Sequence, residues 1–381
     1  MIEPTLKIAV VATAYTPNSH ADVIVRRWVN PFPTDAEYEW TGARTRIVSM
    51  AILQKGDTDL SREVCRDNDI HDCESVENAL TLGTNDLAVD AIMIIGEHGE
   101  FPENEFQQKL YPRKELLDQV LAVFDRSGRV VPIFFDKHFS WNVDFAKEMY
   151  GGLESRSIPW FGGSSLSLCP MLPPPGDLHG EEFEEVVVTT WSALEAYLFH
   201  GLEVLEAVVE QRRGGESGVE SIIAWRDETA WAAMDRGEFS PDLLEAALRS
   251  VGGEVWPSFQ TWCAKRDQPL EIFQLRYKDG LKATIVRLNG IIRKWAFAAR
   301  LDGRELPVAA APMAGTAEQG TPHFARLARR IEDFFLTGQS PVPRTRLYVT
   351  TLACAYCMQA LAEPGVLLSG LDIVAPVRSL E

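Results

Sequence analysis

Five short apolar runs in the N-terminal part of the chain constrain its fold more than any other feature of the sequence. The runs are KIAVVATA, TRIVSMAIL, DAIMIIG, RVVPIFF and SIPWFGG. Stretches with helical spacing lie between them, among them residues 67–82 and 115–126. Buried strands that alternate with helices are typical of a parallel sheet with crossover helices. Because such open sheets bind ligands beyond the carboxyl ends of their strands, the polar residues after each run are candidate site residues.

The rest of the chain has a different pattern, which begins after the proline-rich stretch CPMLPPPGD. A helix is expected at residues 193–213, closed by Gly214 and Gly215. Three strand-like runs then end in DG or NG turns and predict an antiparallel meander: LEIFQLRYKDG, LKATIVRLNG and RKWAFAARLDG. Two closing helices are predicted in HFARLARRIEDFFLTG and LYVTTLACAYCMQALA.

We therefore predict a fold of the α/β plus α+β class with two domains. A chain of 381 residues that is 46% hydrophobic and 24% charged can bury one large core or two moderate ones. The expected N-terminal domain, residues 1–162, is a Rossmann-like parallel sheet of the nucleotide-binding type. The expected C-terminal domain, residues 163–381, is built on a twisted, mainly antiparallel sheet, and its last helix can pack back on the N-terminal domain.

Charge and cysteine content narrow the classes of partner and compartment. The formal net charge of −18 opposes binding to nucleic acid and to anionic membrane surfaces. No apolar run has the length of a membrane span and the first residues lack a signal-peptide layout, so a cytoplasmic protein is expected. The six cysteines are too scattered for a disulfide framework and are expected to be reduced. Cys354 and Cys357 fall in an apolar stretch that predicts a buried helix.

The first apolar run continues into residues 12–17, ATAYTP, where a nucleotide-binding fold carries its G-x-G-x-x-G turn. Those glycines permit the tight turn and the close approach of a pyrophosphate, and each replacement adds a Cβ. Pro17 also removes an N–H group. The second run has no acid at its immediate end to hold a ribose hydroxyl, since Asp57 and Asp59 come several residues later. The local chemistry therefore opposes dinucleotide binding.

Dense polar segments follow the third and fourth runs. After DAIMIIG, Glu97 and His98 predict a substrate or metal pocket in which Arg113 binds an anionic group, and the alternative is a solvated acidic loop. After VVPIFF come Asp136, Lys137 and His138. A lysine there can act as a general acid or base if burial lowers its pKa, and the alternative is a salt-bridged lysine at the sheet edge.

Two further segments carry candidate residues. His200 and Glu203 are three apart and share a helix face, which suits a metal pair, a general-base couple or a core histidine with satisfied hydrogen bonds. Ser164 and Ser165, with the two glycines before them, can hold substrate oxygens, although a turn explains them almost as well.

The histidines raise a metal hypothesis. His20, His98, His138 and His200 can converge with Glu97 or Asp136, and His98, His138 and His200 are then the expected ligands. Such a set suits a divalent transition metal that activates water or polarises a carbonyl. The other histidines, His71, His179 and His323, lie in polar contexts and are interpreted as structural or exposed.

Three segments resemble the glucose-fructose oxidoreductase / inositol dehydrogenase (Gfo/Idh/MocA) family. VVPIFFDKHFSWNVDFAKEM is similar to the family's E-K-P strand and its following helix, EAYLFHGLEVLEAVV to its D-x-x-x-H-x-x-D helix, and EDFFLTGQSPVPRTRLYVTTLACAYCMQAL to its closing segment. The resemblance implies that Lys137 and His200 face a sugar, cyclitol or related polyol beside NAD or NADP, and it implies a homo-oligomer formed through an exposed sheet. The chain departs from the family at Ala196, at His138 and in the missing glycines. A bound cofactor is expected near Ala12, Ala14, Tyr15 and Glu97.

Three functions remain open at this point. The first is a nicotinamide-dependent oxidoreductase acting on a small polyol, with Lys137 and His200 as the acid–base pair. The second is a redox-inactive descendant that uses the polar cluster, with or without a divalent metal, for lyase, isomerase or hydrolase chemistry on a polyol-derived substrate. The third is a sugar-binding or regulatory protein without catalysis. The missing glycines favour the second, and the Lys and His positions favour the first; in the first two the substrate contacts include Arg113, Asp136, His138, Ser164 and Ser165.

Overall fold

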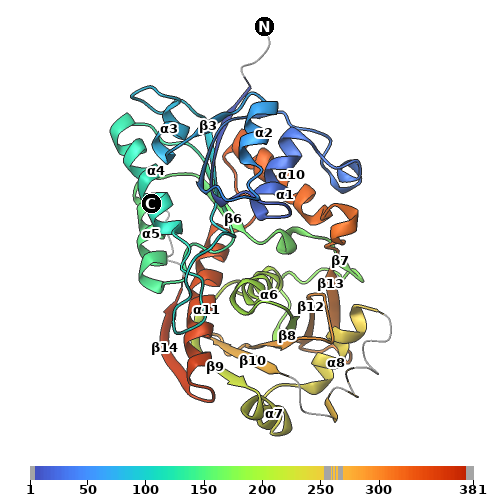
Figure 1. The fold of residues 1–381 in the computed structure, drawn as a ribbon. Coiled ribbons are helices and arrows are strands. Elements are labelled where there is room, and N and C mark those ends of the chain that lie inside the picture. The colour runs from blue at the N-terminus through green and yellow to red at the C-terminus, as the bar shows by residue number, and fades with distance from the viewer. Residues whose placement is uncertain (1–4, 253–258, 260, 262, 265–268, 375–381) are drawn as a thin grey trace. The chain divides into compact units, whose positions relative to one another are not determined.

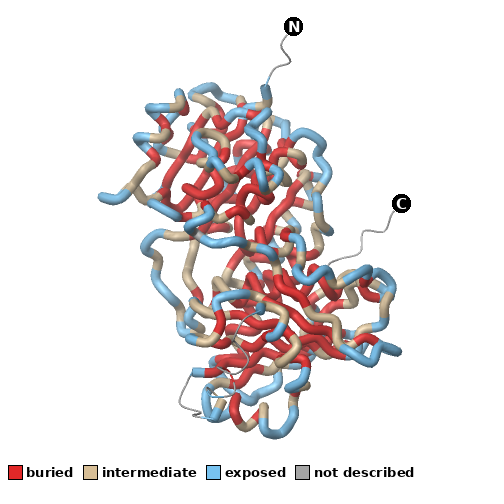
Figure 2. The backbone as a smooth tube through the Cα atoms, turned by 90° about the vertical axis from the view of Figure 1, so that its right-hand side faces the viewer, coloured by how far each residue is buried: buried red, intermediate tan, exposed pale blue. Residues whose placement is uncertain are grey.

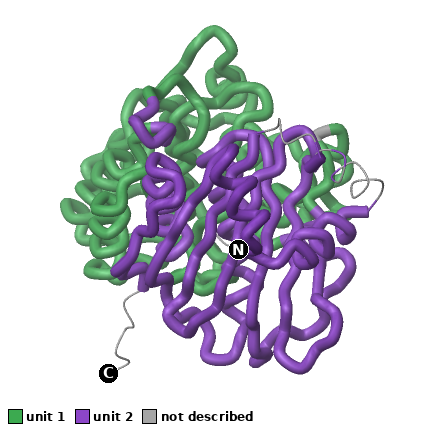
Figure 3. Tube along the Cα trace, turned by 90° about the horizontal axis from the view of Figure 1, so that it is seen from below, with its two compact units in different colours: residues 1–102, 110–168, 314–347 green, residues 103–109, 169–313, 348–381 purple. Residues whose placement is uncertain are grey.

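The computed structural model describes residues 5–252, 259, 261, 263–264 and 269–374. It divides into two compact units, shown in Figure 3, each made of several segments. Unit 1 comprises Met1–Pro102, Leu110–Leu168 and Ala314–Leu347, and unit 2 comprises Glu103–Lys109, Cys169–Met313 and Tyr348–Glu381. The single domain boundary expected between residues 162 and 163 stays a prediction.

Unit 1 is built on a six-stranded parallel sheet with the strand order β3-β2-β1-β4-β5-β6 (Figure 1). Its strands are β1 (Lys7–Ala14), β2 (Arg46–Gln54), β3 (His71–Cys73), β4 (Ala91–Ile95), β5 (Ile133–Asp136) and β6 (Trp160–Gly163). This is the strand order of a doubly wound dinucleotide-type fold. Strands β1 to β3 are added toward one edge of the sheet and strands β4 to β6 toward the other, so the order reverses between β1 and β4. The expected parallel sheet is confirmed.

Helices cover the two faces of this sheet. They are α1 (His20–Val29), α2 (Ser61–Asp67), α3 (Val76–Thr81), α4 (Arg113–Ser127), α5 (Val143–Ser155) and α10 (Pro322–Thr337), and the short 3-10 segments are η1 (Asp35–Tyr38), η2 (Ser165–Leu168) and η3 (Ala317–Gln319). Helix α10 lies beside α1 although about 300 residues of sequence separate them. Its apolar side, with Phe324, Leu327 and Ile331, completes a core formed by β1, β2 and α1.

The helical spacing expected over residues 67–82 is wrong in part. Helix α2 ends at Asp67, the edge strand β3 follows, and α3 begins at Val76. Strand β3 has only three residues, of which His71 and Asp72 are exposed. A short polar edge strand has no apolar alternation, so the sequence pattern does not reveal it.

Unit 2 is built on an eight-stranded mixed sheet with the order β14-β9-β10-β11-β8-β12-β13-β7. Its strands are β7 (Met171–Leu172), β8 (Phe183–Thr190), β9 (Val219–Arg226), β10 (Leu270–Tyr277), β11 (Lys282–Leu288), β12 (Ala296–Leu301), β13 (Val308–Pro312) and β14 (Leu367–Ile373). Its helices are α6 (Leu194–Val209), α7 (Glu228–Asp235), α8 (Pro241–Ser250) and most of α11 (Arg344–Ala362). Among the described strands of this sheet, every pairing is antiparallel except that of β11 with β8, so the expected mainly antiparallel sheet is confirmed.

The predicted three-strand meander is wrong at its third strand. Strands β10 and β11 form the expected hairpin, but β8 lies between β11 and β12 and pairs with both. The side chain of Asn289, in the NG sequence, accepts a hydrogen bond of 2.6 Å from the Ser192 N–H just after β8. Asn289 therefore links the segment after β11 to the segment after β8, and β11 and β12 do not form a hairpin. The NG sequence alone does not distinguish this link from a two-residue hairpin turn.

Both faces of the unit 2 sheet are covered within the chain. On β11, Ile285 lies next to Gly201 of α6, whereas the neighbouring Val286 belongs to a core shared with α7 and α8. Because successive strand residues point to opposite faces, helices cover both sides of the sheet here. Figure 2 shows the strands of both sheets as mostly buried. The exposed sheet through which the resemblance implied a homo-oligomer is thus covered at these positions, and the homo-oligomer stays a prediction.

Among the described residues no cysteine forms a disulfide, and no helix is long and apolar enough to cross a membrane. Cys354 and Cys357 lie buried in α11, as predicted.

Gly162, in β6, offers a test of the packing between two strands. A Cβ there would lie 2.6 Å from the Phe135 carbonyl oxygen and 2.7 Å from Leu347 Cδ2. The Gly162→Ala variant should lose ~2 kcal/mol or more of unfolding free energy, because backbone cannot move aside cheaply. The matched control is Gly151→Ala on α5, where nothing lies within 4 Å of the added Cβ and helix propensity favours alanine. Urea unfolding of both variants measures the difference, and equal stability would contradict the packing described.

Candidate active site

Three strands of unit 1 end side by side and bring the candidate residues to one edge of the sheet. Ala12 of β1 pairs with Ile95 of β4, and Ile95 pairs with Asp136 of β5. The Thr13 hydroxyl donates a hydrogen bond of 2.7 Å to the Glu97 carbonyl oxygen, which ties the segment after β4 to β1. The polar segments after the third and fourth apolar runs therefore meet, as expected from a parallel sheet.

A buried ionic cluster forms at this edge. The Glu97 carboxylate accepts a 2.8 Å hydrogen bond from Arg113, and Lys137 Nζ lies 3.9 Å from its other oxygen. Arg113 Nη1 lies 3.2 Å from His138 Nε2. Each of these residues is at most 7% exposed. Burial raises the pKa of Glu97, but the charges of Lys137 and Arg113 outweigh burial and lower that pKa to about 2.

The backbone places two of these side chains in an unusual conformation. His98 and Lys137, the residues that turn the chain after β4 and β5, both have φ of 69°. A left-handed conformation is uncommon for residues with a Cβ, and such strain concentrates at functional sites. The sequence contained no signal for it, because glycine is the residue usually expected at such positions.

A second pair of side chains stands beside the ionic cluster. His20, the first residue of α1, has its Nδ1 atom 2.6 Å from an Asp136 carboxylate oxygen. The His98 ring lies next to it, with 5.2 Å between ring centroids. Burial, followed by the charge of His20, lowers the pKa of His98 to about 4, so His98 is neutral near pH 7. His20 thus contacts Asp136, and His98 lies beside His20.

The start of α1 tests whether the chain fits a dinucleotide. The Ser19 hydroxyl accepts hydrogen bonds from the N–H groups of Thr16 and Asp22, and the Asp22 carboxylate accepts one of 2.9 Å from the Asn18 N–H. In a glycine-rich turn such N–H groups bind the pyrophosphate. Here side chains of the protein occupy them, and Asp22 places a negative charge where the phosphates would lie.

The residues expected near a cofactor are packed into the protein. Ala12 and Ala14 belong to β1, in agreement with the first apolar run, and their place near a cofactor stays a prediction. Tyr15 is 1% exposed within the hydrophobic core, and burial raises the pKa of its hydroxyl. At the end of β2, Gln54 binds the backbone N–H and carbonyl of Glu100. In the arrangement described, the β1–α1 turn does not fit a pyrophosphate in the way glycine-rich turns do.

The metal hypothesis is not supported. Among the described residues no group of three or more His, Cys, Asp or Glu side chains is arranged to hold a metal ion. His138 has the guanidinium of Arg113 at 3.2 Å, and a fixed cation repels a metal ion. His200 lies in unit 2, so the three expected ligands do not form one group within either unit.

Unit 2 places His200 among aromatic rings. The His200 ring meets Trp295 edge-on with 5.3 Å between centroids, and Tyr197 stacks on Trp295 at 5.1 Å. Glu203 is 1% exposed and accepts a 2.7 Å hydrogen bond from the Thr350 hydroxyl of α11. Glu203 therefore anchors α11, which is a structural role that the helix-face argument did not anticipate.

Ser164, which follows β6, makes a local contact typical of a turn. The Ser164 hydroxyl accepts a 3.1 Å hydrogen bond from the Leu166 N–H, and Ser165 begins η2. Both serines are buried. This contact agrees with the turn alternative for Ser164, and substrate binding by either serine stays a prediction.

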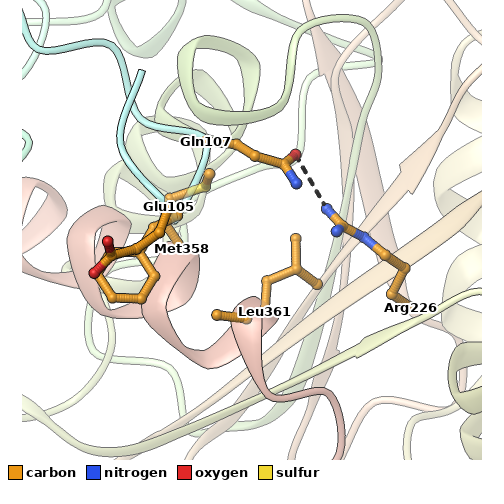
Figure 4. A pocket seen from close by; sticks show the side chains of 7 residues that line it. Glu105, Gln107, Arg226, Met358 and Leu361 are labelled. Carbon is orange, nitrogen blue, oxygen red and sulfur yellow. Dashed lines mark hydrogen bonds between the residues drawn. The ribbon is translucent and has the colours of Figure 1, made fainter. Parts of the chain in front are cut away.

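Unit 2 contains a cavity between residues 105–107, β9 and α11, but it cannot hold a sugar-sized substrate. It has a volume of about 20 Å³, room for about one water molecule. Figure 4 shows Arg226 reaching Gln107, at 3.5 Å, across this cavity. The other lining residues are Glu105, Phe106, Met358, Leu361 and Ala362.

Comparisons with known proteins identify the fold. Neither a family model nor a curated protein sequence matches this chain. Among solved structures, GenD2 from gentamicin A biosynthesis, in complex with NAD, has a TM-score of 0.58 at 12% identity over 97% of both chains. A myo-inositol dehydrogenase from Corynebacterium glutamicum ATCC 13032 gives 0.56 at 11% identity over 96% of this chain and 99% of its own. A super-repressor mutant of Gal80p from Saccharomyces cerevisiae gives 0.57 at 10% identity over 97% and 100%.

The chain has the fold of Gfo/Idh/MocA-type dehydrogenases, which confirms the resemblance at the level of fold. At these identities the likeness establishes architecture and leaves chemistry to the residues of the site. The neighbours include dehydrogenases and a repressor, so the fold by itself does not require catalysis.

Proposed function

We propose that this chain is an enzyme that transfers protons on a small sugar, cyclitol or related polyol-derived molecule, at the carboxyl edge of β1, β4 and β5. The observation that carries the proposal is the buried cluster of Glu97, Arg113 and Lys137 beside the His20–Asp136 pair. Burying so many ionisable groups is costly, and active sites are where such groups gather.

Charge balance supports a neutral substrate. Two basic residues of the cluster, Arg113 and Lys137, stand against two acidic ones, Glu97 and Asp136, all buried in unit 1. Arg113 pairs with Glu97, so its charge is not available for the anionic group expected from the sequence. A hydroxylated, uncharged molecule fits a site with balanced charge better than a phosphate or a carboxylate does.

The first candidate reaction is oxidation with NAD or NADP. It is supported by the fold and by neighbours described as an inositol dehydrogenase and as a complex with NAD. Bound nicotinamide would supply hydride transfer, and the family resemblance puts Glu97 near it, which stays a prediction. Lys137 and His200, the acid–base pair that the resemblance implies, belong to different units, so their cooperation stays a prediction.

The second candidate reaction is proton transfer without redox chemistry, at a carbon beside a carbonyl, as in an isomerase or lyase. The specific observation in its favour is that Ser19 and Asp22 occupy the N–H groups at the start of α1. The geometry of the described residues supports this second reaction better than the first.

Calorimetric titration of the folded protein with NAD⁺, NADH, NADP⁺ and NADPH separates the two reactions. We expect no saturable binding of any of the four, because the Asp22 carboxylate repels phosphates. In parallel, incubation in D₂O with keto and aldehyde sugars and cyclitol ketones should give deuterium at the carbon beside the carbonyl, detected by NMR. Saturable nucleotide binding with hydride transfer would establish the first reaction instead. The absence of both hydride transfer and deuterium incorporation would favour a binding or regulatory protein.

A further inference from the structure

We propose that His20 is the general base of this site and that Asp136 is its positioning residue. The inference rests on the proposed function and names the residues that move the proton. It differs from the Lys137 and His200 pair implied by the family resemblance, because it uses a histidine at the start of α1. Every group in the argument belongs to unit 1.

The geometry fixes which ring nitrogen can act. His20 Nδ1 lies 2.6 Å from Asp136 Oδ2, which is a hydrogen-bond distance. Because a carboxylate oxygen can only accept a hydrogen bond, His20 Nδ1 is the donor and carries the proton. The other nitrogen, Nε2, then holds the lone pair of the neutral ring. The same hydrogen bond stabilises the imidazolium that forms once Nε2 has taken a proton.

The local fold keeps this pair in place and leaves it reachable. Ser19 caps α1 and fixes its first residue, His20, while Asp136 ends the buried strand β5. The Asp136 side chain is 3% exposed and the His20 side chain is 15% exposed. The carboxylate is therefore rigid, and the histidine retains access to a ligand. Phe324 packs edge-on against the His20 ring, with 5.1 Å between centroids.

His98 supplies a second, independent observation. Its Nε2 atom is buried and has no hydrogen-bond partner among the described residues. An unsatisfied buried polar atom is costly, so a ligand that bonds to it gains that energy. Because the pKa of His98 is lowered, its imidazole is neutral near pH 7. A neutral imidazole can donate a hydrogen bond to a carbonyl oxygen without transferring its proton.

The proton step balances with these groups alone. His20 Nε2 takes a proton from the carbon beside the substrate carbonyl, so a C–H bond breaks and an N–H bond forms. The electron pair forms the C=C bond of the enolate, and the charge moves to the oxygen that His98 Nε2–H contacts. His20 then returns the proton to carbon, or a deuteron in D₂O, and no oxidant or reductant is consumed.

The variants His20→Gln and Asp136→Asn test the inference in the full-length protein. Deuterium incorporation into the carbonyl sugars should fall by about 100- to 10,000-fold for His20→Gln, the usual contribution of a general base. It should fall less for Asp136→Asn, with an altered pH profile that a purely structural role would not give. The control is His179→Gln, since His179 Nδ1 makes a similar 2.9 Å contact with Asp177 on the surface, and its incorporation rate should be unchanged.

A readout without substrate separates the two proposals. In ¹⁵N-histidine-labelled protein, long-range ¹H–¹⁵N spectra near pH 7 should show His20 as the Nδ1–H tautomer in the wild type and a changed tautomer balance in Asp136→Asn. Wild-type exchange that persists in His20→Gln, or an unprotonated His20 Nδ1, would overturn the inference. The expected tautomer together with no exchange on any sugar supports the pair and overturns the proposed substrate class instead.

Discussion

Replacing Glu97 by Gln should lower the free energy of unfolding by about 3–5 kcal/mol, the usual cost of breaking a buried ion pair from one side. The amide keeps the shape of the side chain but removes the charge that pairs with Arg113 and Lys137. Arg113 would stay 2% exposed and lose the carboxylate that it contacts at 2.8 Å, so the cost of burying its charge would no longer be offset by Glu97. Urea unfolding near pH 7, followed by circular dichroism, measures the effect.

The matched control is Glu103→Gln. Glu103 pairs with Lys109 at 3.1 Å, but the two side chains are 51% and 42% exposed. An exposed pair contributes ~0–1 kcal/mol because water already solvates both charges. Similar losses for the two variants would contradict the assignment of Glu97 as a buried counter-charge.

The pH dependence of the Glu97 contribution has a definite sign. The pKa of Glu97 is lowered to about 2 in the folded protein, below its ordinary value. Its stabilisation is therefore present above the unfolded pKa of about 4.3 and is lost as the pH falls toward 2. The difference in stability between wild type and Glu97→Gln should shrink over this range.

Acidification from about pH 6.5 to about pH 4 should destabilise the protein by up to ~3 kcal/mol for each of two partly buried histidines, His98 and His323. The pKa values of His98 and His323 are lowered to about 4. In this pH range the unfolded chain binds protons at both residues while the folded protein does not. Stability is therefore lost as the pH falls, and it is fully present above the unfolded value of about 6.5.

The charges that surround the two histidines explain the lowered pKa values. For His98, burial acts first and the charge of His20 second, and Lys137 adds to them against the opposite effect of Glu97 and Asp136. For His323, burial is again the largest cause. His20, Arg27 and Arg326 also lower its pKa, against the hydrogen bond between its Nδ1 and the Ala314 carbonyl.

Urea midpoints measured across this pH range test the effect. His98→Gln and His323→Gln should each flatten the pH dependence by removing one titrating group, and the double variant should flatten it most. His71→Gln, at an exposed position, should leave the slope unchanged. A wild-type stability that stays constant down to about pH 4 would show that both histidines remain accessible to protons in the folded state.

Much of unit 1 could be predicted from the sequence because its strands are short, almost wholly apolar runs. The run Ala91–Ile95 is apolar and buried at every position, which is typical of a central parallel strand. Ser19 precedes α1 and its hydroxyl caps that helix, a role that serine often has. Strand β3 was missed because an edge strand with exposed polar residues has no such run. The position of β8 between β11 and β12 was missed because it depends on pairing between distant segments.

Part of the candidate site followed from the same logic. Residues after β4 and β5 had to meet at one edge, and Glu97 with Lys137 does so. That Arg113 would pair with Glu97 could not be predicted, since the charge of Glu97 attracts whichever cation is nearest in space. The interpretation of His323 as structural or exposed missed that its low pKa depends partly on the charge of His20.

The amino-acid sequence by itself determined which segments form the parallel sheet and which polar residues lie at its carboxyl edge, because period and burial are local properties of a run. Only the tertiary structure decided how those residues pair. Asp22 turns back on the start of α1, Asp136 binds His20 from 116 residues away, and Lys137 turns with φ of 69°. These contacts depend on distances of a few ångströms between segments whose separation along the chain carries no information about their separation in space.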